Sequence, residues 1–167
     1  MIRCVLSILI LVALSASDAP AQGDLGAQRA SLRGINEFFV DVTVEGPEHL
    51  VESDQFRRDV VAYRIVHRIR EAGLPVQQAA RDRDRNMLPN LHIHVNMLEV
   101  DQGIIPFAVA AGFYQQVRVL DNEREMAAAT WTESVLGLVS GDLLATIPQS
   151  VDTLVDQFIE DFGSANE

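Results

Sequence analysis

The sequence predicts a single α+β domain, a two-layer sandwich in which two helices pack on one face of a mostly antiparallel sheet of four or five strands. Three observations support this prediction. Apolar and polar residues alternate, as in half-buried strands, over 91–97 and over 109–119. Two stretches, 54–72 and 146–163, repeat apolar residues at helical spacing. Along the chain the expected order is strand, helix, short strand, three strands, helix.

Residues 1–21 are predicted to form a secretory signal peptide that is removed after Ala21. Arg3 provides a positive start, residues 5–14 form an apolar run that is too short to span a bilayer, and Ala-Pro-Ala at the end offers the small residues that a signal peptidase recognises. Cleavage after Ser17 is the alternative. The mature protein is therefore expected to be periplasmic or secreted.

Cys4, the single cysteine, precedes the apolar run, whereas a lipid anchor needs a cysteine just after it, so lipidation is not expected. Removal of the signal peptide also removes the chance of a disulfide. No later stretch is long and apolar enough for a membrane helix. The remaining chain is expected to comprise a flexible lead-in over 22–34 and one domain over 35–164.

The first half of that domain is expected to contain a strand over 37–45, a helix over 54–72 and a short strand over 75–78. Ser53 is the expected N-cap of the helix, and Gly73 is expected to end it in the left-handed conformation. The buried stripe of the helix is predicted to comprise Phe56, Val60 or Val61, Ile65, Val66 and Ile69.

The second half is expected to contain a solvated loop over 81–86 and then the two long strands, with Gly103 in the turn between them because it tolerates a positive φ. A last strand over 126–133 carries Trp131, which we expect to be partly buried. Residues 135–141, apolar with two glycines, are expected to form a partly buried connection.

The final helix shows the clearest amphipathic pattern in the chain. Thr146 and Gln149 have the spacing of a capping box, and the helix is expected to end near Gly163. Its predicted buried face comprises Ile147, Val151, Leu154, Val155, Phe158 and Phe162.

Composition excludes several kinds of chemistry. The formal net charge is −11 and all 13 basic residues are arginine, which argues against binding to nucleic acid or to an anionic membrane surface. Without lysine there is no Schiff-base catalysis and no Walker-type phosphate loop. Without cysteine in the mature chain there is no thiol nucleophile or thiolate zinc site. No catalytic pair of residues is recognisable in the sequence.

Strand alternation places His92 and His94 side by side on the polar face of the sheet, and Asp41 on the first strand is expected to share that face. Two imidazoles and a carboxylate form a ligand set for zinc, copper or nickel. The same pattern also arises from ordinary exposed polar residues on an open sheet, so the prediction is no cofactor, with a transition metal as the alternative.

Further polar residues could join the histidines in a patch that binds a small ligand or a peptide. The predicted binding residues are His92, His94, Asn96, Tyr114, Gln116 and Arg118. A free sheet edge is a second candidate contact, because an edge strand can accept a peptide by strand addition.

The two predicted helices carry opposite charge. Arg57, Arg64 and Arg68 lie on the first, and the second has an acidic stripe at Asp152, Asp156 and Glu160. Three interpretations remain open: a docking strip for a basic partner, pairing between the two helices, or simply solvated charges. We favour the last two, since exposed ion pairs contribute only about 0–1 kcal/mol each.

Three motifs carry a resemblance: Arg-Glu-Ala-Gly-Leu-Pro-Val at 70–76, Ala-Ala-Thr-Trp at 128–131, and the packing helix from Ser150 to Phe158. Together they resemble small secreted bacterial proteins of unknown function with the same order of elements. More distantly, the layout is similar to that of envelope domains such as the N-terminal domain of the Tol-Pal translocation protein and the LPS-assembly lipoprotein. The resemblance implies a binding role, and it assigns a function to no residue.

The sequence therefore favours an exported, non-enzymatic binding or assembly domain of the bacterial cell envelope, with an envelope protein or a small ligand as partner. The alternative is a metal-binding or metal-dependent hydrolytic protein that uses His92 and His94. Oligomeric state is left open.

Overall fold

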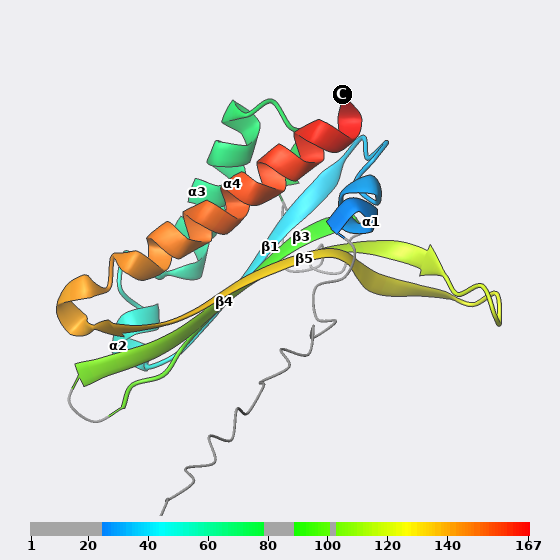
Figure 1. The fold of residues 1–167 in the computed structure, drawn as a ribbon. Coiled ribbons are helices and arrows are strands. Elements are labelled where there is room, and N and C mark those ends of the chain that lie inside the picture. Colours follow the sequence, from blue (N-terminus) through cyan, green and yellow to red (C-terminus); the bar gives the residue numbers. More distant parts are fainter. Residues whose placement is uncertain (1–24, 79–88, 101–102) are drawn as a thin grey trace, which may run out of the picture.

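In the computed structural model, which describes residues 25–78, 89–100 and 103–167, helices pack on one face of a five-stranded sheet (Figure 1). The strands are β1 (Phe38–Glu45), β2 (Val76–Gln78), β3 (Asn90–Met97), β4 (Ile104–Arg118) and β5 (Glu125–Ser140), and the helices are α1 (Leu25–Ala30), α2 (Glu48–Val51), α3 (Arg58–Glu71), the short 3₁₀ helix η3 (Gly141–Leu143) and α4 (Thr146–Asn166). The α+β sandwich and the order of its long elements are confirmed.

The sheet has the strand order β2-β1-β3-β4-β5. Strands β3, β4 and β5 are antiparallel, as the short connections between them predict, whereas β1 runs parallel to both β2 and β3. The parallel pairing of β1 with β2 follows from the crossover through α3, because a chain that returns through a helix enters the sheet in the same direction. The sheet is therefore mixed, with its longest ladder antiparallel.

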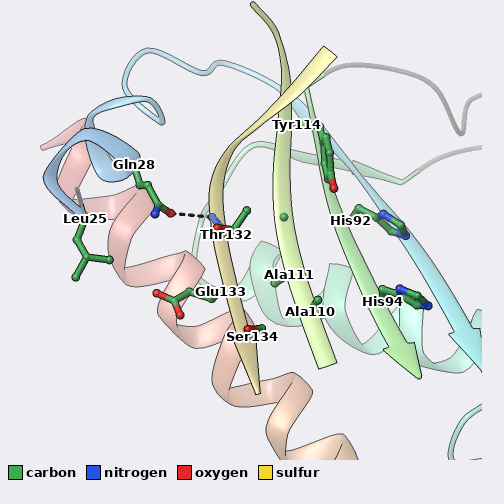
Figure 2. A pocket seen from close by; sticks show the side chains of 11 residues that line it. Leu25, Gln28, His92, His94, Ala110, Ala111, Tyr114, Thr132, Glu133 and Ser134 are labelled. Atoms are coloured by element: carbon green, nitrogen blue, oxygen red, sulfur yellow. Dashed lines mark hydrogen bonds between the residues drawn. The ribbon is translucent and has the colours of Figure 1, made fainter. Parts of the chain in front are cut away.

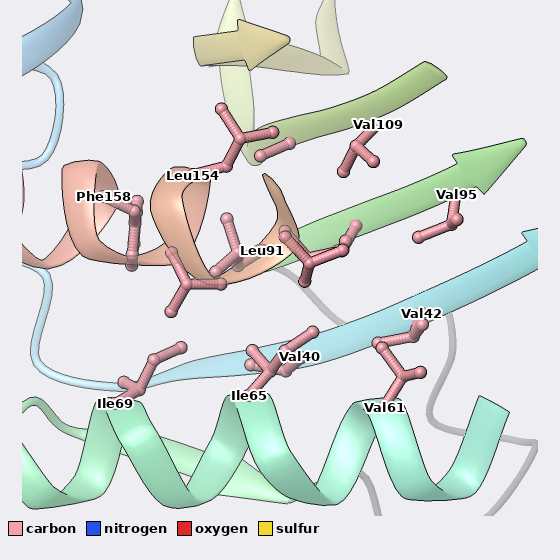
Figure 3. Packing of buried hydrophobic residues seen from close by; sticks show 14 of the residues in the cluster. Val40, Val42, Val61, Ile65, Ile69, Leu91, Val95, Val109, Leu154 and Phe158 are labelled. Atoms are coloured by element: carbon pink, nitrogen blue, oxygen red, sulfur yellow. The ribbon is translucent and has the colours of Figure 1, made fainter. Parts of the chain in front are cut away.

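The core lies between the sheet and helices α3 and α4 (Figure 3). Alternate residues of β3 are buried, and every residue of the predicted stripe on α4 is buried. On α3 the stripe includes Val61, and Val60 is only half-buried. Phe158 is fully buried among the rings of Phe38, Phe113, Trp131 and Phe162, with centroids 5.2–5.7 Å away. Trp131 is 1% exposed, more deeply buried than predicted.

The first long helix begins later than predicted. The Ser53 hydroxyl donates to the Leu50 carbonyl at 2.6 Å, so it closes the short helix α2 and does not cap the next one. The N-cap of α3 is Arg57, whose side chain makes no capping hydrogen bond. At the other end Gly73 has φ +80°, the left-handed conformation that was predicted.

The capping box predicted for α4 does not form. Its N-cap is Ala145, without a side-chain hydrogen bond, and Thr146 is already helical. The helix also continues past Gly163 to Asn166, whose side-chain nitrogen donates to the Leu32 carbonyl at 3.1 Å. This contact with the beginning of the chain is one that a local pattern does not reveal.

The charged faces of the helices pair with each other. Arg64 lies 3.3 Å from Asp152, and Arg68 makes a bidentate pair with Asp156 at 2.5 Å. Arg57 pairs locally with Asp54 and Asp59 instead. The contacts at Asp152 and Asp156 therefore support pairing between the two helices as the interpretation of the arginines and the acidic stripe.

The predicted lead-in is structured over residues 25–34. Residues 25–30 form α1, and Leu32 is fully buried. Arg29 makes an ion pair with the buried Asp161 at 2.6 Å, and the Trp131 indole nitrogen donates to the same carboxylate at 2.9 Å. The sequence did not predict this contact, because the segment is polar and Asp161 lies 132 residues farther along the chain than Arg29.

The connection predicted over 135–141 is instead the second half of β5, up to Ser140. Val135 and Val139 face the helices, while Leu136 and Leu138 are exposed on the other side. Both faces are apolar here, so the alternation that identifies a strand is missing from the sequence.

Part of the prediction falls outside the described residues, namely the signal peptide over 1–21, residues 22–24 of the lead-in, the loop over 81–86 and positions 101 and 102 of the turn. Gly103, which follows them, has φ +70° as expected. In the three described ranges, no helix has both the length and the apolar character needed to cross a membrane.

Candidate functional site

The face of the sheet that points away from α3 and α4 is named here the open face. Strand alternation places Asp41, Thr43 and Glu45 of β1 there, and His92 and His94 of β3 beside them. The core-facing residues of the same strands are apolar and buried, which fixes this orientation. The predicted arrangement of the two histidines is therefore present.

A depression of about 430 Å³ crosses the open face and is named here the trough (Figure 2). It runs over β4, between the rings from β3 and β4 on one side and the hydroxyl side chains of β5 on the other, with α1 beyond β5. The lining residues are Leu25, Gln28, His92, His94, Ala110, Ala111, Gly112, Tyr114, Thr132, Glu133 and Ser134.

The trough exists because β4 carries very small side chains between two strands with larger ones. Ala110 lies opposite His94 and Ser134, and Gly112 lies opposite His92 and Thr132. A Cβ atom at Gly112 would lie 2.9 Å from Cε2 of Tyr114. Glycine at this position therefore lets the Tyr114 ring lie along the end of the trough.

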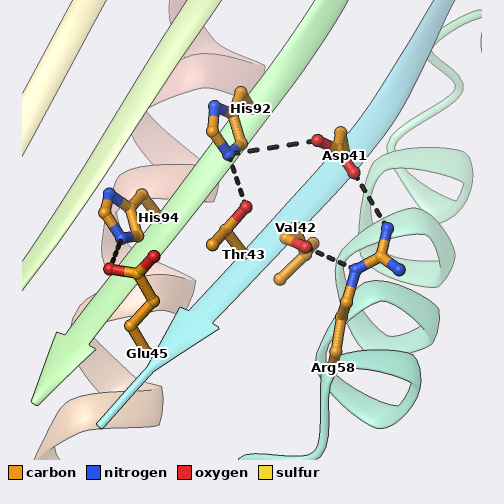
Figure 4. A network of polar contacts seen from close by, with 7 residues as sticks. All are labelled: Asp41, Val42, Thr43, Glu45, Arg58, His92 and His94. Atoms are coloured by element: carbon orange, nitrogen blue, oxygen red, sulfur yellow. Dashed lines mark hydrogen bonds and ion pairs between the residues drawn. The ribbon is translucent and has the colours of Figure 1, made fainter. Parts of the chain in front are cut away.

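The wall of the trough on the β3 side is held by polar contacts with β1 (Figure 4). Nε2 of His92 lies 3.0 Å from the Thr43 hydroxyl, and Nε2 of His94 lies 3.1 Å from a Glu45 carboxylate oxygen. The two imidazole rings are stacked, 6.2 Å apart and 8° from parallel. These contacts with β1 fix the orientation of both rings.

Behind the histidines, Asp41 is held by an arginine. Nη2 of Arg58 lies 3.0 Å from the Asp41 carboxylate, while its Nε donates to the Val42 carbonyl at 2.6 Å. Asp41 in turn lies 4.0 Å from Nε2 of His92. The arginine thus anchors the carboxylate that lies next to His92.

The pKa of His92 is lowered in the folded protein, chiefly because burial disfavours the charged imidazolium, with a further contribution from His94 that Asp41 opposes. We expect an NMR titration of the His92 ring to have its midpoint below the ordinary 6.5. Asp41→Asn should lower this midpoint further, because it removes the charge that favours protonation.

The sign of the pH effect on stability follows from the lowered pKa. Between the folded pKa and 6.5 the unfolded chain binds more protons, so the contribution of His92 to stability increases with pH and is complete above 6.5. Glu99→Gln, which alters the distant partner of His49, should leave the His92 midpoint unchanged. A wild-type midpoint at or above 6.5 would contradict the burial argument.

The predicted metal ligands do not form one group. His94 contacts Glu45, while His92 contacts Thr43 and is 4.0 Å from Asp41. Across residues 25–78, 89–100 and 103–167, no set of three or more His, Cys, Asp or Glu side chains is placed to hold a metal ion. The hypothesis of a transition-metal site receives no support from this geometry.

The structure brings together only part of the predicted binding patch. His92, His94 and Tyr114 line the trough, with the His92 and Tyr114 rings 6.3 Å apart. Gln116 and Arg118 lie farther along β4, where Arg118 pairs with Glu123 at 3.2 Å. Asn96 is half-buried beyond His94 on β3.

Sequence reasoning missed the floor and the far wall of the trough. The floor residues Ala110 and Gly112 carry no polar signal, and Thr132 and Ser134 are recognisable only once β5 is paired with β4. A row of small residues at alternate positions of a central strand, here Ala108, Ala110 and Gly112, is the pattern that could have predicted a depression.

No family model and no curated protein matches the sequence. Among solved structures, the chain is similar to the lipoprotein GNA1162 from Neisseria meningitidis, with 13% sequence identity, a TM-score of 0.34, and coverage of 75% of this chain and 99% of that chain. Values this low support no inference from that protein to this one. The description of the site therefore relies on its own geometry.

Proposed function

We propose that this protein is an exported, non-enzymatic binding protein of the bacterial cell envelope, and that it holds a small polar ligand in the trough. The predicted signal peptide supports export. The observation that carries the binding proposal is the trough itself: about 430 Å³ is within the range of small-molecule sites. Its rings and hydroxyl groups are held in place by a regular sheet, so little order has to be gained on binding.

The lining of the trough favours an uncharged ligand. The lowered pKa of His92 keeps its imidazole neutral near pH 7, so this ring adds no positive charge to the wall of the trough. Thr132 and Ser134 add hydroxyl groups on the opposite wall. Glu133 is the only carboxylate among the lining residues and no arginine is among them, so an anionic ligand would find no partner of opposite charge.

Binding is proposed in preference to a reaction because of the contacts that the histidines make. Nε2 of His92 is engaged by Thr43, and Nε2 of His94 by Glu45. A general base needs its nitrogen within hydrogen-bonding distance of the proton that it removes from a substrate. Here the Nε2 atoms of both rings point toward β1, where their contacts fix the rings as a wall of the site.

Filling the trough tests the proposal. Ala110→Phe adds a ring to its floor at an exposed position, so the fold should be preserved while the affinity for the ligand falls at least about tenfold. Ala127→Phe, also at an exposed position but on β5 outside the trough, is the matched control. We would record amide NMR spectra of the mature protein with the small-molecule fraction of its native envelope.

The expected result is a set of shifts confined to the strand residues around the trough, lost in Ala110→Phe and retained in Ala127→Phe. Shifts at another surface, or equal shifts in both variants, would show that the trough is not the binding site. Absence of any shift with the complete envelope fraction would contradict the proposal of a small ligand.

A further inference from the structure

The outer edge of β5 carries a palindromic sequence. Residues 134–140 read Ser-Val-Leu-Gly-Leu-Val-Ser, which is the same in both directions about Gly137. We name these residues the free edge segment, because β5 is the last strand of the sheet and pairs with β4 on one side only. Two antiparallel copies of a palindrome, aligned on its centre, place matching residues opposite one another along their whole length.

The direction of the backbone groups shows which residues could pair. The Thr132 amide donates to Oε1 of Gln28 in α1 at 2.9 Å, so the backbone of Thr132 faces away from β4. Along an antiparallel strand, the backbone N–H and C=O groups of successive residues point alternately to one side and to the other. The residues of β5 that face outward after Thr132 are therefore Ser134, Leu136, Leu138 and Ser140.

The other side of β4 gives the same result. Pro106 is the β4 partner of Leu138, and its carbonyl accepts from the Leu98 amide at 2.9 Å, toward β3. Pro106 therefore does not hydrogen-bond to Leu138, whose own N–H and C=O point outward. No residue in the described part of the chain pairs with these outward groups of the free edge segment.

The free edge segment has none of the usual protections of an edge strand. Exposed edges normally carry charges, prolines or bulges that prevent pairing with another strand. Here the nearest charges are Glu133 and Asp142, outside the segment, and the β-bulge lies at the other end of the β4–β5 ladder. On the open face Leu136 is 83% exposed and Leu138 is 72% exposed.

We propose that the free edge segment is the site of homodimerisation, where a second copy of this chain adds its own β5 antiparallel about a two-fold axis at Gly137. The charge distribution favours a second copy over a charged partner strand. The chain carries a net charge of −11, so most approaches between two copies are repulsive, whereas this segment brings no charge against itself. A self-complementary strand is also what an isologous interface requires.

The proposed register is defined residue by residue. Leu136 lies opposite the partner's Leu138, and since both face outward they form hydrogen-bonded pairs on either side of the axis. Gly137 meets the partner's Gly137 at the axis, in the closely spaced non-hydrogen-bonded position. The pairing ends where Gln28 covers Thr132 on one side and where the chain turns at Gly141 on the other.

Charged pairs at the two leucines test the dimer and its register together. Leu136→Lys/Leu138→Lys places lysine opposite lysine twice, so the protein should sediment as one chain. Leu136→Lys/Leu138→Glu places lysine opposite glutamate at the same two positions, so it should sediment as two chains, like wild type. Gly137 is avoided because a Cβ there would lie 2.6 Å from the Phe107 ring, within the fold itself.

The measurement is sedimentation velocity of the mature protein over a series of concentrations, with thermal unfolding to confirm that each variant is folded. Leu120→Lys/Met126→Lys is the matched control, because both residues are exposed and lie outside the free edge segment, and it should remain dimeric. Hydrogen exchange adds an independent measurement: the Leu136 and Leu138 amides should exchange slowly in wild type and rapidly in the lysine pair.

Three results would overturn the proposal. A wild-type protein that sediments as one chain at every concentration does not form this dimer. If the Leu136 amide of that monomer is still protected from exchange, another segment pairs with the edge. A Leu136→Lys/Leu138→Lys variant that remains dimeric uses a different surface. A monomeric Leu136→Lys/Leu138→Glu variant rules out pairing centred on Gly137.

Discussion

Replacing Phe158 by alanine is expected to lower the free energy of unfolding by about 3–5 kcal/mol, the range for deleting a fully buried aromatic side chain. Phe158 is fully buried and contacts rings from both layers, those of Phe38 and Phe113 from the sheet and Phe162 from its own helix. The cavity would lie where α4 rests on the sheet, so few neighbours could move in to fill it. Denaturant unfolding followed by circular dichroism measures the change.

Leu120→Ala is the control for Phe158→Ala, because Leu120 is 90% exposed and its truncation should change stability by no more than about 0.5 kcal/mol. A loss of less than about 1 kcal/mol for Phe158→Ala would mean that this part of the core relaxes freely, contrary to the ring packing described above.

The second large effect is expected at Asp161, the carboxylate that joins α1, α4 and β5. Asp161→Ala should cost about 3 kcal/mol, because it leaves the buried Trp131 indole N–H without its acceptor and Arg29 without its partner. Unfolding followed by tryptophan fluorescence reports on this position directly, since Trp131 is the single tryptophan. Glu160→Gln, at the exposed neighbouring position, should leave stability unchanged.

The same carboxylate gives a pH dependence. Burial by itself would raise the pKa of Asp161, but hydrogen bonds from Trp131, Arg29 and Gln157 more than compensate, and the net shift is downward from 3.8. Its contribution to stability is therefore complete above 3.8 and is lost as the pH falls through the lower folded pKa. Asp161→Asn should flatten the stability profile in this acidic window. An unchanged profile would mean that the carboxylate is not ionised in the fold.

The trough and the free edge segment meet at Ser134, whose side chain lines the trough while its backbone faces outward. In the proposed dimer the partner's Ser140 lies opposite Ser134, at the rim of the trough. The two proposals still fail independently. Leu136→Lys/Leu138→Lys should abolish the dimer and leave trough shifts in the NMR spectrum, whereas Ala110→Phe should abolish those shifts and leave the dimer.

Much of the fold was predictable because the signals are local. Alternation along β3 gave the buried face and the outward direction of His92 and His94, and the apolar stripe of α4 was correct at every residue. Cap positions were not predictable, since the Ser53 hydroxyl could accept from an amide of the following helix or donate to the Leu50 carbonyl, and only the position of α2 decided between them. The far half of β5 was missed because a strand with two apolar faces loses its alternation.

The sequence by itself determined the two layers, the buried stripes of both long helices and the row of polar residues on β3, because each depends on periodicity within one element. The tertiary structure decided everything that depends on neighbours. The trough exists only because β4, with its small side chains, lies between β3 and β5, and α1 is joined to α4 by the ion pair between Arg29 and the distant Asp161. The palindrome was present in the sequence, but its meaning depends on β5 being the last strand, which is a property of the whole sheet.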